Sequence, residues 1–368
     1  MIAGRVVVGL SGGVDSAVAA LRLKRAGYEV EGLHMANWEA EDDDAYCTAA
    51  QDFQDARAIC EVLGIPLHRA DFSAEYRERV FAHFLSELAA GRTPNPDVLC
   101  NAEIKFDAFL DYATRLGAEA IATGHYAALA PDRPADDPWL MQPADRDKDQ
   151  TYFLHAVPQA AFQRVLFPLA DSDKAVVRAD ARDAGFPVFD KKDSTGICFI
   201  GERPFREFLA THLKAEPGEI RDTDDQLLGT HTGLINYTIG QRKGLGIGGR
   251  ADAPEAAWYV VGKERASNTL RVVQGEDHPA LFRQEAHADQ LNWIGEPPAV
   301  GASDITARIR YRQPEQACTI TRLDADGLRV RFERPQRAVT PGQYLVLYQQ
   351  GRCLGGGVIT DDMTEGAG

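Results

Sequence analysis

The sequence predicts an α/β protein of three domains. A mainly parallel, Rossmann-like sheet flanked by helices is expected in residues 1–203, a small β-containing domain in 204–279 and an antiparallel β-barrel in 280–363. Strand-like and helix-like segments alternate over the first 125 residues, which is the pattern of βαβ units. After about residue 204 the chain becomes rich in glycine, and from about residue 280 short apolar runs recur at regular intervals.

The elements of the first domain follow from the hydrophobic period and from glycine and proline stops. Residues 5–10 are a β-branched run that ends in a glycine-rich turn, and residues 15–26 are rich in Ala and Leu until Gly27 stops them. The expected strands are 5–10, 29–35, 67–71 and 118–123, and the expected helices are 15–26, 48–63, 73–90 and 104–116. Ligands of parallel sheets bind beyond the carboxyl ends of the strands, so we expect the site in the loops there.

The elements of the other two domains are shorter. The central domain is built from the glycine-rich segments 217–228, 229–249 and 258–275. Barrel strands are expected over 304–311, 318–323, 327–333, 343–348 and 353–360. Runs of this length, separated by turn residues, are typical of a compact antiparallel barrel.

The charge, apolar content and cysteine count of the chain exclude several classes of protein. The chain of 368 residues carries 40 basic and 55 acidic side chains, a net charge of −15, which excludes a protein that coats nucleic acid indiscriminately. The acidity lies in residues 1–150, with 14 basic and 26 acidic side chains, whereas residues 301–350 carry 8 basic and 5 acidic. No apolar run approaches the roughly 18 residues of a membrane span, and no secretory signal is recognised, so a cytoplasmic protein is expected. The six cysteines form no Cys-x-x-Cys pair, and we predict no metal site.

A glycine-rich loop joins the first expected strand to the first expected helix. Its residues are Gly9, Leu10, Ser11, Gly12, Gly13, Val14, Asp15 and Ser16. Consecutive glycines let backbone N–H groups converge beside a helix N-terminus, which suits phosphate, and Asp15 can help to hold a hydrated Mg²⁺. The loop matches neither Gly-x-x-x-x-Gly-Lys-Ser/Thr nor Gly-x-Gly-x-x-Gly. The alternative is a tight turn whose Asp or Ser caps the helix.

Two further motifs each contain a cysteine. In residues 91–101, two prolines stiffen a loop that presents Asn95, Asp97 and Cys100, and in residues 193–202 Cys198 follows Ser-Thr-Gly and two lysines. Asp97 is a candidate general acid/base, and its alternative is a turn residue after Pro96. Cys60, Cys318 and Cys353 are interpreted as small buried residues, and Cys47 is left open.

The chain resembles the bacterial tRNA-specific 2-thiouridylases, which belong to the PP-loop ATP pyrophosphatases. The resemblance runs nearly end to end and rests on motifs that occur in the family's order. They are the loop 9–16, Met35 to Trp38, the loop 91–101, Ala122 to Tyr126, Lys148 to Leu154, the Cys198 segment, Gly240 to Gly246, Arg310 to Gln313, Pro341 to Gln343 and Gly355 to Gly357.

The resemblance implies a role for each matching residue. It implies that ATP lies on residues 9–16 with Met35 and Gly124 near the adenosine, and that Asn95, Pro96 and Asp97 face the target uridine. It further implies that Cys198 carries a persulfide, and that Cys100 completes the sulfur transfer through a transient Cys100–Cys198 disulfide. The implied tRNA contacts are His125, Lys148, Asp149, Gln150, Arg310, Tyr311 and Gln343.

The implied reaction is 2-thiolation of the wobble uridine (U34) of tRNA. The uridine C2 oxygen is adenylated by ATP with Mg²⁺, and sulfur then replaces AMP. The implied partners are tRNA and a sulfur-donor relay protein or cysteine desulfurase, with no membrane and no permanently bound cofactor. Three alternatives stay open: another PP-loop enzyme, such as a 4-thiouridine synthase or an amide-forming synthetase; a noncatalytic nucleotide-responsive RNA-binding protein; and a thiol-disulfide oxidoreductase.

Overall fold

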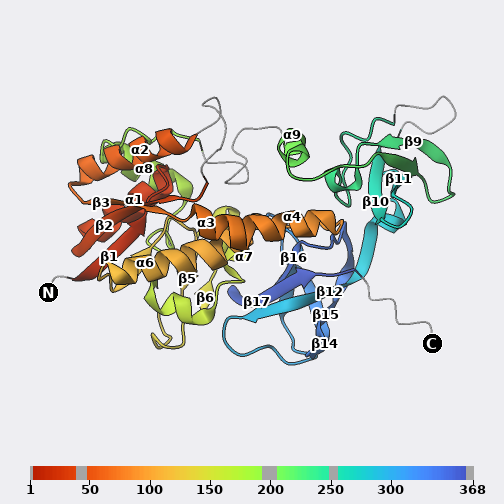
Figure 1. Cartoon of the computed structure of the whole chain (residues 1–368). Helices are drawn as coiled ribbons and strands as arrows, with labels where there is room; N and C mark the ends of the chain where they lie inside the picture. The colour runs from red at the N-terminus through yellow and green to blue at the C-terminus, as the bar shows by residue number, and fades with distance from the viewer. Residues whose placement is uncertain (1–2, 39–47, 193–204, 248–255, 362–368) are drawn as a thin grey trace.

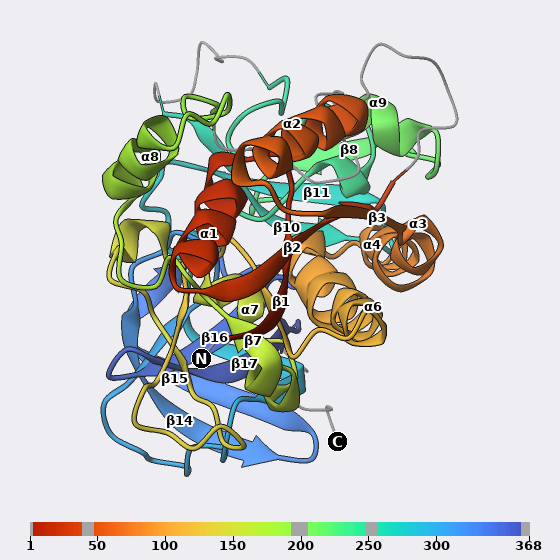
Figure 2. The same cartoon turned by 90° about the vertical axis from the view of Figure 1, so that its left-hand side faces the viewer.

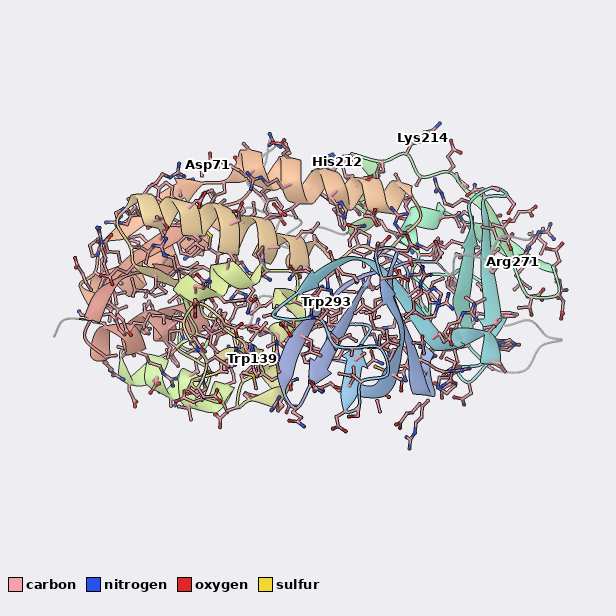
Figure 3. The ribbon with its side chains drawn as sticks, turned by 90° about the horizontal axis from the view of Figure 1, so that it is seen from below. Asp71, Trp139, His212, Lys214, Arg271 and Trp293 are labelled. Carbon is pink, nitrogen blue, oxygen red and sulfur yellow. The ribbon has the colours of Figure 1, made fainter. Side chains whose placement is uncertain are left out.

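The computed structural model describes residues 3–38, 48–192, 205–247 and 256–361. The first domain lies at one end of the molecule, the barrel lies beside it, and the central domain forms the other end (Figure 1). The labelled Arg271 marks that central-domain end, and Trp139 lies where the first domain meets the barrel (Figure 3). Among the described residues, none of the helices combines the length and the apolar character that a membrane span needs.

The first domain is built on a parallel sheet of order β3-β2-β1-β4-β7. Its strands are β1 (Ala3–Gly9), β2 (Tyr28–Ala36), β3 (Leu67–Asp71), β4 (Ala120–Ala122) and β7 (Val165–Leu166). The first four were predicted, whereas β7 was not, because a two-residue strand has no detectable period. The strand order reverses between β1 and β4, and a parallel sheet opens its ligand crevice at such a reversal.

Helices cover both faces of this sheet (Figure 2). On one face, α1 (Val14–Arg25), α2 (Thr48–Leu63) and α8 (Lys174–Asp183) share a core with Val6 and Val8 of β1. On the other face, Val7 packs with two long helices. One is continuous through α3 (Ser73–Glu75), the π-helical η1 (Tyr76–Phe81) and α4 (Ala82–Ala89). The other runs through α5 (Pro96–Leu99), the π-helical η2 (Cys100–Ala108) and α6 (Phe109–Arg115).

The start of this second long helix corrects the prediction. A helix was expected from residue 104, with Asp97 and Cys100 in a loop, yet the helix begins at Pro96. Asn95 is its N-cap, and the side-chain oxygen of Asn95 accepts a hydrogen bond from the Asp97 N–H at 3.2 Å. Proline is favoured at the first helical position because its missing N–H is not needed there. Pro96 therefore starts the helix, and Asp97 and Cys100 lie one turn apart on it.

The rest of the first domain links the sheet to the barrel. It contains β5 (Ala128–Leu129), β6 (Leu140–Met141), the 3₁₀ turns η3 (Arg146–Lys148) and η4 (Gln159–Arg164), and α7 (Thr151–Leu154). The helix α9 (Phe205–Ala210) follows at the start of the central domain. The β5–β6 hairpin extends the barrel sheet, because Met141 pairs with Arg352. The Arg352 guanidinium also lies over the Trp139 ring, 3.8 Å from its centroid. The first domain and the barrel are thus joined by backbone pairing as well as by side chains.

The central domain is a small sheet of order β10-β11-β8-β9. Its elements are β8 (Gly218–Arg221), β9 (Leu227–His231), η5 (Leu234–Asn236), β10 (Trp258–Glu264) and β11 (Thr269–Gln274), and η6 (Pro279–Leu281) leads out of it. Ile220, Val260, Leu270 and Val272 form its core.

The C-terminal domain is a closed antiparallel barrel, as predicted. Its strands are β12 (Phe282–Trp293), β13 (Ile305–Arg308), β14 (Gln316–Asp324), β15 (Gly327–Arg337), β16 (Tyr344–Gln349) and β17 (Arg352–Ile359), and β12 closes the barrel on β17. Glycine makes the closure possible, because a Cβ on Gly355, Gly356 or Gly357 would overlap the main chain of a neighbouring strand. β12 was not predicted, since its polar sequence lacks a clear alternation.

Candidate functional site

The loop 9–16 leaves β1 and enters α1 at the point where the strand order reverses. Gly12 has φ of 75°, and a Cβ there would overlap the Asp52 carbonyl. The N-cap residue Gly13 offers no side-chain cap, while the Ser16 hydroxyl donates back to the Gly13 carbonyl at 3.1 Å. The capping alternative is therefore not what the loop does, because neither Asp15 nor Ser16 is the N-cap of α1. A helix N-terminus left open in this way favours an anion.

The exit of β4 packs directly against the start of α1. A Cβ on Gly124 would lie 2.6 Å from the Ser16 amide nitrogen and 2.7 Å from the Asp15 carbonyl carbon. Only glycine permits this approach, which brings the β1 and β4 loops together. Met35 at the end of β2 is half-buried, and its Cε would lie 3.2 Å from a Cβ on Gly9. Met35, Gly124 and the loop 9–16 thus border one region, although their expected contact with adenosine stays a prediction.

The Asp15 carboxylate is held by two side chains that sequence reasoning did not assign to the site. The Lys174 ammonium lies 2.7 and 2.8 Å from its two oxygens, and the Tyr126 hydroxyl donates to Oδ1 at 3.0 Å. Tyr126 belongs to a motif that supported the resemblance, but a single lysine 159 residues away in sequence gives no signal of its own.

A second lysine reaches the loop from the other side. Lys191 donates to the Gly12 carbonyl at 3.2 Å and to Asp52 and Asp55 of α2 at 2.8 and 2.6 Å. Burial lowers the pKa of Lys191, but the hydrogen bonds to Asp52 and Asp55 outweigh burial and leave its pKa raised. Its charge is thus committed to α2 and fixes the loop against that helix.

The residues before Asp97 are anchored on the other two domains. The Thr93 N–H donates to the Pro341 carbonyl at 2.9 Å, and Gln343 donates to the Thr93 carbonyl at 2.7 Å. Lys263 of the central domain donates to the Gly91 carbonyl at 3.0 Å. The loop that leads to Asn95 and Asp97 is therefore positioned by the barrel and the central domain together.

Asp97 and Cys100 lie at the start of the helix that follows. The Cys100 N–H donates to the Asp97 carbonyl, the Asn101 side chain donates to the same oxygen at 2.9 Å, and Cys100 is 1% exposed. Burial raises the pKa of the Asp97 carboxyl, and the nearby positive charge of Lys105 offsets part of that rise. A carboxyl with a raised pKa and a thiol on one helical face suit proton transfer and nucleophilic attack.

Protein families and curated relatives match this chain over nearly its whole length. Three family models match consecutive parts of the chain. The model described as "tRNA methyl transferase HUP domain" matches residues 4–202, the one described as "tRNA methyl transferase PRC-barrel domain" matches 206–274, and the one described as "Aminomethyltransferase beta-barrel domain" matches 283–359. The chain is 55% identical to tRNA-specific 2-thiouridylase MnmA of Hahella chejuensis over 96% of this chain and 97% of that protein. It is 54% identical to the protein of the same name from Cupriavidus taiwanensis, over 96% of this chain and 98% of that one. The chain belongs to the tRNA-specific 2-thiouridylase family. This membership confirms the predicted resemblance and, with the three matched domains, the predicted fold class.

The residues that the 2-thiouridylase resemblance assigns to tRNA differ in their exposure. Arg310 is exposed and its guanidinium donates to the Arg337 carbonyl at 3.4 Å, while Tyr311 packs against Phe153 with ring centroids 4.3 Å apart. Lys148 is half-buried. Gln343 is half-buried and holds the loop 91–95 as described. Arg310 is thus the member of this set that the structure leaves most open to RNA.

His125, Asp149 and Gln150 are held in the interior or by backbone groups. Nδ1 of His125 and Oγ1 of Thr123 are hydrogen-bonded at 2.8 Å. Burial, together with the positive charge of Lys105, keeps the pKa of His125 well below its usual range. Asp149 is 2% exposed and pairs with Arg308 of the barrel at 2.8 Å. In this conformation the Asp149 carboxylate is not open to RNA, and its contacts are those of a structural ion pair.

Gln150 connects this segment to the loop 9–16. Its side-chain oxygen accepts from the Tyr126 N–H at 2.8 Å, and its own N–H donates to the Tyr126 carbonyl at 3.0 Å. Tyr126 in turn donates to Asp15. Gln150 of the family motif Lys148–Gln150 therefore supports the loop 9–16 through Tyr126, a role that sequence reasoning missed because it depends on contacts between residues far apart in the sequence.

Besides the buried Cys100, the other five cysteines fall into two groups. Cys60, Cys318 and Cys353 are buried, and burial raises the pKa of each thiol to about 12, which agrees with their interpretation as small core residues. Cys198 and Cys47 lie outside the described residues, so the approach of Cys198 to Cys100 stays a prediction. Within the described residues no group of His, Cys, Asp and Glu is placed to hold a metal ion.

The buried Asp97 carboxyl gives a prediction about stability. Folding raises the pKa of this carboxyl above its ordinary value of 3.8, so the folded state holds the proton at pH values where the unfolded state has lost it. The free energy of unfolding therefore falls as the pH rises from 3.8 through the raised pKa of the folded state. We expect Asp97→Asn to raise the thermal midpoint at neutral pH, with the difference vanishing below about pH 4. Thermal denaturation of both proteins from pH 3 to 8 measures this. Asp107→Asn, on the exposed side of the same helix, is the control, and an equal difference at all pH values would contradict the argument.

Proposed function

We propose that this chain is a tRNA-uridine 2-sulfurtransferase that converts the wobble uridine (U34) of tRNA to 2-thiouridine at the expense of ATP. The observation that carries the proposal is the phosphate loop 9–16, whose helix N-terminus is open beside Gly124. It occurs in a chain more than half identical to tRNA-specific 2-thiouridylases over nearly their full length.

The first step activates the base. The C2 oxygen of uridine attacks the α-phosphorus of ATP, the bond to the β-phosphate oxygen breaks, and pyrophosphate leaves. The open amides of the loop and the α1 N-terminus would bind the phosphates, and Asp15 would hold Mg²⁺ through its carboxylate oxygens. Met35 and Gly124 border the loop where the adenosine would lie. The product is an O-adenylate, whose AMP is a far better leaving group than a carbonyl oxygen.

The second step delivers sulfur. The terminal sulfur of a Cys198 persulfide attacks C2 and AMP leaves. The Cys100 thiolate then attacks the Cys198 sulfur, which frees the sulfur on C2 and forms a Cys100–Cys198 disulfide. Alternatively, Cys100 first releases sulfide, which attacks C2. Either route ends with a disulfide that an external dithiol must reduce, and a relay protein or cysteine desulfurase must reload Cys198. Asp97, with its raised pKa, would move the proton of the base.

The target base must leave the anticodon stack to reach this site. Asn95 and Pro96 open the helix that carries Asp97 and Cys100, so a base bound by Asn95 would lie at the entrance to both groups. Pro341 and Gln343 of the barrel bind Thr93, which lies just before Asn95. RNA bound on the barrel would therefore lie beside the residues proposed to bind the target base. Arg310 supplies local positive charge for the RNA backbone despite the acidic first domain.

The deciding experiment is an in vitro thiolation. Purified protein is incubated with ATP, Mg²⁺, sulfide and unmodified tRNA, and nucleosides and nucleotides are analysed. We expect 2-thiouridine and AMP in equal amounts, and absence of both would refute the proposal. A parallel reaction with S-adenosylmethionine in place of ATP tests the methyl transfer named in the family descriptions, and methylated nucleosides there would favour that function instead. A further reaction, in which a cysteine desulfurase and cysteine replace sulfide, tests whether a desulfurase can supply the sulfur.

The phosphate loop itself gives a second test. Gly12→Ala forces a side chain into a left-handed backbone and into the Asp52 carbonyl, so the loop must open. We expect ATP affinity to fall at least about 10-fold, as measured by equilibrium dialysis without tRNA. Gly27→Ala also occupies a left-handed position, but at the far end of α1 with open space around its Cβ, and serves as the control. Equal ATP affinity in the two variants would contradict the role of the loop.

A further inference from the structure

The Asp15 carboxylate and the Lys174 ammonium form an ion pair inside the phosphate-binding region. The side chains are 31% and 13% exposed, and both carboxylate oxygens lie within 2.8 Å of Nζ. A lysine ammonium is a compact cation that pairs with both carboxylate and phosphate oxygens. The position is thus already built to hold a positive charge beside the loop.

Lys174 is fixed in place by its own segment. It is the first residue of α8, whose N-cap Asp173 accepts from the Val176 N–H at 3.0 Å, and the Lys174 N–H donates to Asp145 at 3.1 Å. The helix α8 is bound to α1 by the pair between Arg22 and Asp180, with N and O 2.8 Å apart. The backbone that carries the ammonium therefore cannot shift independently of the loop 9–16, and only the flexible side chain can move.

The two lysines at the loop differ in their surroundings. Lys191 is bound to the two carboxylates of Asp52 and Asp55 and to the Gly12 carbonyl, and its role there is structural. Lys174 faces Asp15, the carboxylate expected to take Mg²⁺ when ATP arrives. Once a divalent cation occupies Asp15, repulsion between the two cations and the new negative charge of the phosphates both draw the ammonium toward the phosphates.

We infer that Lys174 is a ligand of the β- and γ-phosphates of ATP, which it binds in exchange for Asp15, and that it stabilises pyrophosphate as the leaving group. This inference rests on the proposed use of ATP. Negative charge grows on the β-phosphate oxygen as its bond to the α-phosphorus breaks, so a cation placed there lowers the barrier to adenylation. The residue acts on the triphosphate tail and has no contact with the part of ATP that becomes AMP.

The test is a comparison of ATP and AMP binding without tRNA. Equilibrium dialysis of Lys174→Met should show ATP affinity lowered roughly 10- to 100-fold and AMP affinity within about 2-fold of the unsubstituted protein, since a hydrogen-bonded charge contributes on this scale. Lys174→Arg should recover part of the ATP affinity. Lys24→Met, at the opposite end of α1, is the matched control and should change neither affinity.

A purely structural role predicts different results. If Lys174 only orders Asp15 and the loop, ATP and AMP affinities fall together, or the effect disappears in an Asp15→Asn background, and the inference is overturned. It is also overturned if ATP affinity is unchanged. Unchanged circular dichroism of Lys174→Met shows that the variant is folded. Failure of the thiolation assay with the unsubstituted protein refutes the proposed function, whereas the ratio of ATP to AMP affinities depends only on the phosphate contact.

Discussion

With a cysteine desulfurase and cysteine as the sulfur source, replacing Cys198 by serine is expected to abolish 2-thiouridine formation, with a loss of at least roughly 10³-fold, because serine cannot carry a persulfide. Replacing Cys100 by serine should cause a loss of similar size for a different reason, since the sulfur is loaded but not released. The measurement that separates the two is labelling with radioactive sulfur from a desulfurase. Cys100→Ser should retain bound radioactive sulfur that dithiothreitol removes, whereas Cys198→Ser should acquire no such label.

The control for this pair is a thiol from the core. Cys318 is 6% exposed and its pKa is raised to about 12 by burial, so Cys318→Ala should neither lose the label nor reduce thiolation of folded protein. Full thiolation by Cys198→Ser would contradict the sulfur-carrier role of Cys198. A label that persists in Cys198→Ser and disappears in Cys100→Ser would reverse the order of the two cysteines.

The strand, glycine-rich loop and helix of residues 5–26 could be predicted from sequence because all their determinants are contiguous. Two glycines, a short β-branched run and the following Ala- and Leu-rich helix lie within 22 residues, from Arg5 to Ala26, so one window contains the whole signal. Lys174 and Tyr126 could not be assigned to this site in the same way, because they join Asp15 only through the packing of α8 and the exit of β4. A single lysine or tyrosine has no pattern from which its partner can be inferred.

The errors in the fold have other causes, which are local to the segments concerned. The strands with a β-branched or alternating sequence were predicted, whereas β7 is two residues long and β12 is polar, so neither has a detectable period. The helix start at Pro96 was missed because proline was interpreted only as a loop former. Its preference for the first helical turn, with Asn95 as the cap, was visible in the sequence and gives the better prediction.

Loss of Arg308 is expected to destabilise the protein by about 3–5 kcal/mol, because it leaves a carboxylate buried without its cation. Arg308 is 8% exposed, pairs with Asp149 at 2.8 Å and with Glu315 at 3.2 Å, and lies over the Tyr348 ring. These contacts join the first domain to the barrel. Urea denaturation of Arg308→Met should show the loss, and the exposed Arg322→Met should leave the unfolding midpoint unchanged.

Asp149→Asn then decides what the acidic residue of the Lys148–Gln150 segment does. Its Oδ1 accepts from the N–H and hydroxyl of Thr151 at 2.9 and 2.6 Å, and its Oδ2 accepts from Gln142 at 2.8 Å, so the carboxylate is fully engaged by protein. If its role is the ion pair, Asp149→Asn lowers stability, and the double variant with Arg308→Met loses less than the sum of the two single changes. If Asp149 instead contacts tRNA directly, the single variant weakens tRNA binding at unchanged stability. Because Gln150 and Tyr126 connect this segment to Asp15, an ion-pair role also predicts that Asp149→Asn weakens ATP binding in the absence of any RNA.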